Sequence, residues 1–102
     1  MVKKKLREVI WSDDARKQLK EIYKYLKKDS LQAASLVKNK ILESTRLLSN
    51  SPAVYEADPL KDGNSGNYRA YTVYSYRITY KIESDQIFIL RVRHTSREPL
   101  EY

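Results

Sequence analysis

The side chains best suited to chemistry in this sequence are arginines and a single histidine in its last third. Residues 76–83 and 87–94 alternate between apolar and polar positions, which is typical of two half-buried strands joined by a short turn. In such a pair Arg77, Arg91 and Arg93 share one face of the sheet. Arginine presents a planar fork of donors that fits phosphate and carboxylate groups. The sequence therefore indicates a cationic sheet face that binds an anion.

The register of this strand pair depends on the length of its turn. A two-residue turn at 84–85 would set Lys81 against Phe88 and mix the two faces. A three-residue turn at 84–86 keeps the faces apart, so we expect this register. Its apolar pairs are Ile82 with Phe88, Tyr80 with Leu90, Ile78 with Val92 and Tyr76 with His94. Its polar pairs are Arg77 with Arg93 and Thr79 with Arg91.

An arginine cluster on one sheet face needs a negative partner, because like charges directly opposite one another destabilise a sheet. One candidate partner is a bound phosphate or carboxylate. The other is an acidic residue of the chain itself, for which Glu56, Asp58, Glu98 and Glu101 are available. The first interpretation makes the face a binding site, whereas the second makes it part of the fold.

Two helices are expected before these strands. A first strand is predicted at about 4–10, and Ser12 followed by two acidic residues then predicts a helix start. The apolar stripe of this helix is Ala15, Leu19, Ile22 and Leu26, and the helix ends near Lys28. A second helix is predicted from residues 29–30 to Leu48. Its stripe is Ala33, Val37, Ile41 and Leu48, widened by Ala34 and Leu47.

The order of elements predicts an α+β fold. Residues 49–67 contain both glycines and two of the three prolines, which indicates a loop, and a strand follows at 67–74. The connection between the helices is so short that they should form an antiparallel hairpin. We expect one domain over residues 1–102, in the order β-α-α-β-β-β, with the helix hairpin packed on one face of an antiparallel sheet.

Composition narrows the class of protein. The chain has 102 residues, a net charge of +7, no cysteine and one histidine, so we expect no metal and no cofactor. It shows neither an apolar run long enough to span a membrane nor a secretory leader, and we expect a cytoplasmic protein without a membrane partner. Ten basic and four acidic residues give residues 1–28 a charge of +6. Such a charge favours an anionic partner.

Several motifs together resemble one family. They are Trp11-Ser12, Tyr68-Arg69-Ala70, Tyr76-Arg77-Ile78-Thr79-Tyr80 and Ile89-Leu90-Arg91-Val92-Arg93-His94-Thr95. The sequence resembles the RelE/ParE superfamily of toxins from bacterial type II toxin–antitoxin systems, whose order of elements is the order predicted above. RelE-like members cleave mRNA in the ribosomal A site without a metal, whereas ParE-like members inhibit DNA gyrase and are not nucleases. The resemblance alone does not choose between these activities. The joint presence of Arg77, His94, Arg97 and Tyr102 favours the ribosome-dependent endoribonuclease, with the gyrase inhibitor as the alternative. A third possibility is a family member that retains only antitoxin binding.

Metal-free RNA cleavage needs a base for the 2′-hydroxyl, cations for the phosphate and an acid for the leaving oxygen. By resemblance, the catalytic residues would be Arg77, His94, Arg97 and Tyr102. The expected nucleic-acid contacts are Arg69, Arg91, Arg93 and Lys81. On these grounds replacing Arg77 by alanine should abolish toxicity with little loss of stability.

The same residue types also fit structural roles. His94 shares its predicted face with Leu90 and Val92, so it could equally be a half-buried structural histidine. Tyr76 and Tyr80 are expected in the core, whereas Tyr71 is expected to be exposed and available for stacking on bases.

The family resemblance also implies a protein partner, an antitoxin that wraps the toxin. An acidic antitoxin would match the arginine cluster and the five lysines of the first helix. Its apolar residues would need a groove beside the helix hairpin or an open sheet edge.

Overall fold

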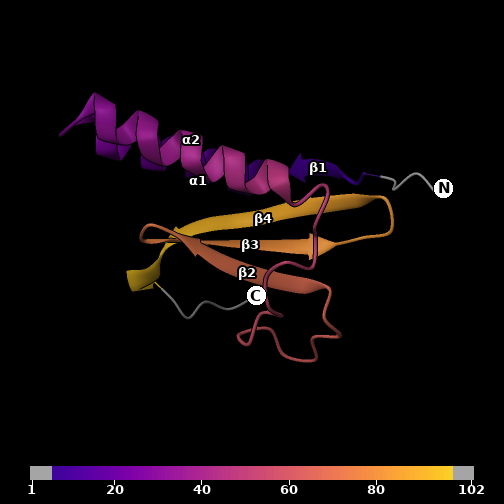
Figure 1. The fold of residues 1–102 in the computed structure, drawn as a ribbon. Helices are drawn as coiled ribbons and strands as arrows, with labels where there is room; N and C mark the ends of the chain where they lie inside the picture. The colour runs from indigo at the N-terminus through magenta and orange to yellow at the C-terminus, as the bar shows by residue number, and fades with distance from the viewer. Residues whose placement is uncertain (1–5, 98–102) are drawn as a thin grey trace.

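The structure is a computed structural model that describes residues 6–97. Its elements are β1 (Glu8–Trp11), α1 (Asp13–Lys27), α2 (Leu31–Leu47), β2 (Tyr68–Val73), β3 (Tyr76–Ile82), β4 (Gln86–His94) and the short 3₁₀ helix η1 (Thr95–Arg97). Figure 1 shows both helices on one side of a four-stranded sheet, with the long α2–β2 loop beside β2. The predicted α+β fold and its order of elements are confirmed. The first strand occupies 8–11 rather than 4–10, and residues 1–5 lie outside the described part.

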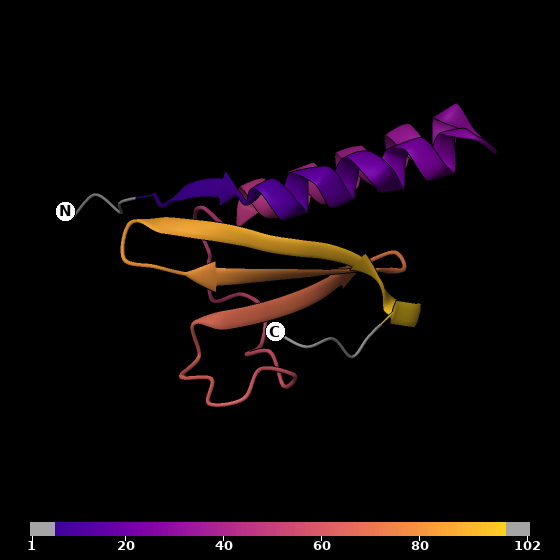
Figure 2. The ribbon, with the colours of Figure 1, turned by 180° about the vertical axis from the view of Figure 1, so that it is seen from behind.

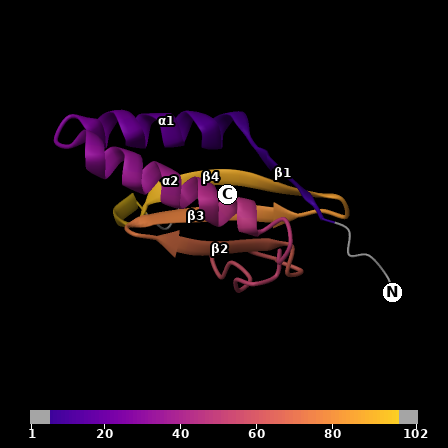
Figure 3. The same ribbon diagram turned by 45° about the horizontal axis from the view of Figure 1, so that its top comes forward.

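The sheet has the strand order β1-β4-β3-β2 and is mixed. Strands β2, β3 and β4 form the predicted antiparallel meander, but β1 pairs with β4 in parallel, from Glu8 beside Gln86 to Trp11 beside Ile89. The helix hairpin is the reason. It returns the chain to the end of the sheet where β1 began, so β2 starts there and β4, two reversals later, runs in the direction of β1 (Figure 3).

Each helix begins at a serine cap. The Ser12 hydroxyl accepts a hydrogen bond from the Ala15 N–H at 3.0 Å, as the predicted start of α1 requires. The Ser30 hydroxyl accepts from the Ala33 N–H at 3.1 Å and starts α2 in the same way. The stripe predicted for α1 is confirmed, since Ala15 and Leu19 are buried and Ile22 packs against the core.

The stripe predicted for α2 is wrong at two places. Ala33 and Leu47 are exposed, whereas Ala34, Ile41 and Thr45 are buried. The rest of the predicted stripe is confirmed, since Leu48 is also buried and Val37 packs against the core. Thr45 is the one buried residue of α2 that the apolar pattern did not include. Thr45 is tolerated there because its hydroxyl donates to the Leu42 carbonyl at 2.9 Å.

The register predicted between β3 and β4 is right for one half of the pair. Tyr76 pairs with His94, Arg77 with Arg93, Ile78 with Val92 and Thr79 with Arg91. Beyond Thr79 the register shifts, and Tyr80 pairs with Ile89 rather than with Leu90. Lys81 lies opposite Phe88, a pairing that the three-residue turn would have excluded. The turn is a two-residue one at 84–85, closed by the Glu83 N–H and the Gln86 carbonyl at 2.8 Å.

A β-bulge at Leu90 reconciles this short turn with the sheet faces. In a regular strand successive carbonyls point to opposite sides, but the Ile89 and Leu90 carbonyls both accept hydrogen bonds from Ser12, from its N–H at 3.0 Å and its hydroxyl at 3.1 Å. The extra residue moves Ile87 and Ile89 onto the buried face with Val92. The helix cap thus also fixes the bulge.

The core lies between the helices and the sheet face turned toward them, which we call the helix face. It contains Tyr76, Ile78 and Tyr80 of β3, whose burial was predicted, together with the buried residues of β4. Within residues 6–97 no helix is both long and apolar enough to cross a membrane.

Candidate functional site

The sheet face turned away from the helices carries Arg77, Lys81, Arg91 and Arg93, and we call it the arginine face. Its members lie on β3 and β4, where alternation turns them away from the core. Arg77 lies directly opposite Arg93, as predicted. The sequence left open whether an external anion or an acid of the chain balances this charge.

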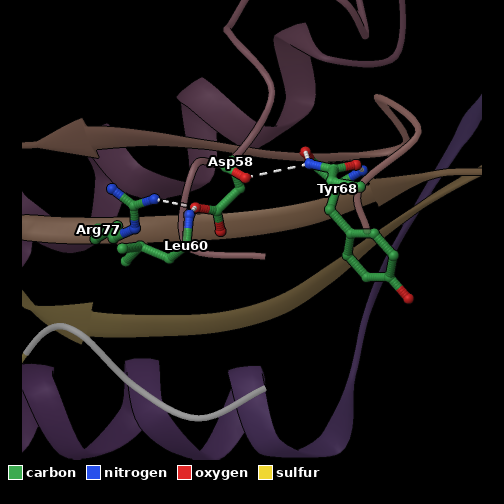
Figure 4. Close-up of polar contacts among 5 residues, drawn as sticks. Asp58, Leu60, Tyr68 and Arg77 are labelled. Atoms are coloured by element: carbon green, nitrogen blue, oxygen red, sulfur yellow. Dashed lines mark hydrogen bonds and ion pairs between the residues drawn. The ribbon is translucent and has the colours of Figure 1, made fainter. Parts of the chain in front are cut away.

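The structure places Asp58 of the α2–β2 loop at this point. Its Oδ1 lies 2.5 Å from Nη2 of Arg77 and accepts the Leu60 N–H at 2.9 Å (Figure 4). The Asp58 side chain is 1% exposed and that of Arg77 is 19% exposed, so the pair is largely removed from water. One of the four acidic residues foreseen for this role therefore neutralises Arg77 from within the chain.

The loop is held against β2 by a network that fixes Asp58. The Asp58 N–H donates to the Tyr68 carbonyl at 2.8 Å, and Ala57 forms a bridge to Arg69. The Asn64 amide donates to the Asp58 and Tyr68 carbonyls at 3.2 and 2.8 Å. Its oxygen accepts the Gly66 and Tyr68 N–H groups, a typical use of Asn in a turn.

Arg69, expected to contact nucleic acid, lies on the helix face and holds the same loop. It pairs with Tyr80, so it points away from the arginine face. Its guanidinium donates to the carbonyls of Tyr55 at 2.5 Å and Gly66 at 3.0 Å. A nucleic-acid contact by Arg69 stays a prediction, and the bonds that the structure gives it are internal.

Lys81 also has partners within the chain. Its Nζ lies 2.8 Å from a Glu83 carboxylate oxygen and 5.4 Å from the centre of the Tyr68 ring. The hydrogen bond to Glu83 raises the pKa of Lys81. Two buried atoms on or beside the arginine face have no hydrogen-bond partner among the described residues, namely Oδ2 of Asp58 and Nε of Arg93.

His94 lies on the opposite face from Arg77. It pairs with Tyr76, and the two rings meet edge to face with centres 5.4 Å apart. Its Nδ1 accepts the Ser96 N–H at 3.1 Å, which leaves the proton of the neutral ring on Nε2. The structure therefore does not bring Arg77 and His94 together at one reacting group.

Two other predicted catalytic residues cannot be placed beside them. The backbone of Arg97 ends η1, and nothing is described of its side chain. Tyr102 lies outside the described residues. Their catalytic roles stay predictions from the family resemblance.

Tyr71, expected to be exposed, is buried with 7% of its surface accessible. Its ring stacks on Tyr55 with centres 4.0 Å apart, and its hydroxyl lies 2.8 Å from that of Ser44. Burial raises the pKa of the Tyr71 hydroxyl. Burial also raises the pKa of Tyr80 to about 12, and its hydroxyl donates to the Pro52 carbonyl at 2.6 Å. Both tyrosines anchor the loop, so neither serves as a platform for bases.

A groove lies between the helix hairpin and β1, and we call it the hairpin groove. The sequence predicted a groove beside the helix hairpin as one of two places for an antitoxin, but it did not identify the lining residues. The groove measures about 680 Å³, and its apolar lining is Val9, Ile10, Trp11, Leu19, Tyr23 and Leu42. Arg16, Lys20, Lys38 and one acid, Glu8, also line it. Leu42 was a possible signal, because it is an apolar residue that lies off the predicted stripe of α2 and is 38% exposed.

Comparison with known proteins identifies the family. A profile that describes the ParE toxin of the type II toxin–antitoxin system parDE matches residues 9–99. The chain belongs to this ParE toxin family. It is thus the toxin of a type II toxin–antitoxin module and a member of the RelE/ParE superfamily, as its motifs indicated. A search of curated protein sequences found no match.

Three solved structures share the fold of this toxin. The chromosomal ParDE system of P. aeruginosa matches with a TM-score of 0.70 and 18% identity, over 87% of this chain and 96% of that one. The RelBE2 toxin–antitoxin complex of Mycobacterium tuberculosis matches with a TM-score of 0.60 and 19% identity, over 90% and 94%. The YoeB dimer of Staphylococcus aureus matches with a TM-score of 0.56 and 18% identity, over 86% and 95%.

Proposed function

We propose that this toxin inhibits growth as a ParE-like protein, by binding DNA gyrase, and that it does not cleave RNA. The observation that carries the proposal is the Asp58–Arg77 ion pair. A cation that must hold a phosphate has to offer its charge to that phosphate, but Nη2 of Arg77 already binds a buried carboxylate, which offsets the charge of the guanidinium. The arrangement supports a structural role for this arginine.

The position of His94 supports the same proposal. General acid–base catalysis requires the acid or base within hydrogen-bond reach of the group whose phosphate the cations hold. His94 and Arg77 point to opposite faces of the sheet, so one phosphodiester could not meet both. A protein that acts by binding alone does not need these side chains to converge.

The second candidate is the ribosome-dependent endoribonuclease. It is favoured by the arginine face, where Arg91 and Arg93 accompany Arg77. In this case Arg91 and Arg93, which are both partly exposed, would hold an RNA phosphate.

Two assays with purified toxin separate the candidates. The first measures supercoiling of relaxed plasmid by gyrase, and the second maps mRNA ends on translating ribosomes. We expect the toxin to block supercoiling or to trap cleaved DNA, with no new mRNA ends. New ends within the ribosomal A site, with supercoiling unaffected, would support the endoribonuclease and contradict the proposal.

The proposal includes an acidic antitoxin that occupies the hairpin groove. The apolar lining suits one side of an amphipathic segment, and Arg16, Lys20 and Lys38 suit acidic residues on its flanks. Beside the groove the outward backbone groups of β1, an edge strand, offer hydrogen bonds to an added strand. Copurification of the toxin with an acidic protein encoded by a neighbouring gene would support this partner.

A further inference from the structure

A second groove lies on the other side of α1, at the end of the sheet where β4 finishes. It measures about 800 Å³ and lies between the C-terminal half of α1 and the strand ends. We call it the tyrosine groove, and the lining residues used below are Glu21, Tyr25, Tyr74, Tyr76, Arg93 and His94. Figure 2 shows how α1 diverges from the sheet toward this end.

The edge of β4 is open along this groove. β1 pairs with β4 only as far as Ile89, so no described strand lies beside the last part of β4 on that side. The Thr95 N–H bonds to Ser75 on the β3 side, so by alternation the main-chain groups of His94 and Val92 face the other way. Gln18 of α1 accepts the Val92 N–H at 2.8 Å. The N–H and carbonyl of His94 face the groove without a pairing strand.

Tyr74 forms the tip of the β2–β3 turn in an unfavourable backbone conformation. Its φ angle is +54°, in the left-handed region that glycine adopts readily and a tyrosine does not. Its ring is not held in the core, since 54% of the residue is exposed. Strain of this kind is concentrated at functional sites. The fold thus tolerates a poor residue for the turn and presents an aromatic ring at the groove.

A second exposed tyrosine lies on the helix side of the groove. Tyr25 of α1 is 66% exposed and lines the groove together with Tyr74. Tyrosine is among the residues that most often supply binding energy in protein interfaces. Two exposed rings and an open strand edge are the elements of a site for an extended peptide.

The charges of the two grooves differ and indicate different partners. The tyrosine groove has one acid, Glu21, and one arginine, Arg93, in its lining, so these charges cancel. The hairpin groove has three basic residues and one acid. An acidic segment is attracted to the hairpin groove, whereas a segment of low net charge suits the tyrosine groove.

We propose that the tyrosine groove binds an extended, nearly neutral segment of the toxin's protein target, which adds to β4 as a strand. The inference rests on the proposed function, because it assumes that toxicity arises from binding a protein. Main-chain hydrogen bonds to His94 hold the segment, and Tyr25 and Tyr74 contact its side chains. The antitoxin and the target then occupy different sides of α1.

The test replaces Tyr74 by glycine and measures growth inhibition after controlled expression. Glycine adopts a positive φ angle without strain, and the substitution removes only an exposed ring. The midpoint of urea unfolding should therefore not fall. We expect the concentration of toxin needed for half-inhibition to rise at least tenfold, and Tyr25→Ser should act in the same direction. Leu47→Ser is the matched control, since Leu47 is 63% exposed on α2 and does not line either groove.

Affinity for the antitoxin is measured on the same variants and should change less than twofold. A folded Tyr74→Gly toxin that inhibits growth like the wild type would overturn the inference, as would a large loss of antitoxin affinity. The gyrase assay keeps the two proposals apart. If wild-type toxin leaves gyrase unaffected while Tyr74→Gly still loses toxicity, gyrase is not the target. The inference that the tyrosine groove binds the target is then retained.

Discussion

The arginine face and the hairpin groove are both basic, yet they use their charge in opposite ways. On the arginine face Asp58 neutralises Arg77 in a pair that is almost closed to water, and Glu83 pairs with Lys81. In the hairpin groove the partner described for Arg16 is the fully exposed Asp13 at 3.3 Å, and Lys20 and Lys38 lie beside apolar side chains that remain open to a partner. The first arrangement stabilises the fold, and the second can recruit an acidic protein.

The difference shows that a count of basic residues does not identify a binding surface. What decides is whether the fold itself supplies the counter-charge. A buried carboxylate makes the arginine that it contacts unavailable to an external anion, because separating the pair would leave an unpaired charge buried away from water. Exposed lysines beside apolar side chains carry no such cost and attract a partner at long range.

The largest effect is expected from breaking the buried pair. Arg77→Ala leaves the Asp58 carboxylate without its cation and should lower the free energy of unfolding by about 3–5 kcal/mol. The buried pair thus leads to a different expectation from that of the sequence, which was a small loss of stability. Asp58→Ala should cost a similar amount, and the double variant less than the sum. Urea unfolding of the four proteins measures the coupling.

Lys81→Ala is the matched control for that cycle. It removes an ion pair on the same face, but one whose partners are 31% and 43% exposed. Exposed pairs contribute at most about 1 kcal/mol. If Arg77→Ala also lowers the free energy of unfolding by less than about 1 kcal/mol, the two ion pairs do not differ in their contribution to stability.

The next effect concerns the hairpin groove. Leu42→Asp places a carboxylate among its apolar side chains and should weaken antitoxin binding by about a hundredfold, the effect of losing one well-buried contact of an interface. Growth inhibition by the free toxin should be unchanged. Leu47→Asp, on the same helix but outside the groove, should bind antitoxin normally. Titration calorimetry measures both, and equal affinities would exclude this groove as the antitoxin site.

A third prediction concerns the tyrosines that anchor the loop above the core. Burial raises the pKa of Tyr71 and raises that of Tyr80 to about 12, so the folded protein keeps these protons where the unfolded chain loses them. The contribution of these two neutral tyrosines to the free energy of unfolding is complete below about pH 10. Between about pH 10 and pH 12 it declines by about 1.4 kcal/mol per pH unit for each tyrosine.

Urea unfolding between pH 9 and pH 12 measures this decline. Tyr71→Phe should reduce the slope by about half, since one of the two titrating groups is removed. If the slope of that variant equals the slope of the wild type, Tyr71 does not titrate on unfolding.

The smallest effect is expected from the lysines of the hairpin groove. Reversing Lys20 and Lys38 to glutamate should slow antitoxin association about fivefold, with little change in dissociation, because rim charges steer encounter. Lys27→Glu with Lys40→Glu changes the net charge equally outside the groove. Stopped-flow rates at low and physiological salt compare the pairs. Equal association rates would show that net charge, not the groove, guides the antitoxin.

Much of this fold follows from local sequence. Ser12 and Ser30 mark the helix starts, and alternation marks the strands of the meander, because these signals act within a few residues. The bulge at Leu90 could not be predicted in this way. Ser12, which fixes it, lies 78 residues earlier in the chain.

The candidate site shows the same limit. The sequence offered four acids for the arginine face, and the choice of Asp58 depends on how Asn64 and Arg69 fold the loop. The burial of Tyr71 could not be predicted from its strand, because its ring is covered by Tyr55 of the α2–β2 loop. In both cases the deciding contacts join the loop to distant parts of the chain.

One variant tests most directly whether Arg77 serves the fold or an external phosphate. Arg77→Met combined with Asp58→Asn removes both charges together, and Asn keeps an oxygen for the Leu60 N–H. The measurement is growth inhibition at matched expression, with urea unfolding to establish that the variant is folded. We predict that the concentration of toxin needed for half-inhibition stays within about twofold of the wild-type value. This corresponds to a change of less than about 0.5 kcal/mol in the free energy of binding to the target. A folded double variant that no longer inhibits growth would contradict the structural role and assign Arg77 to the target.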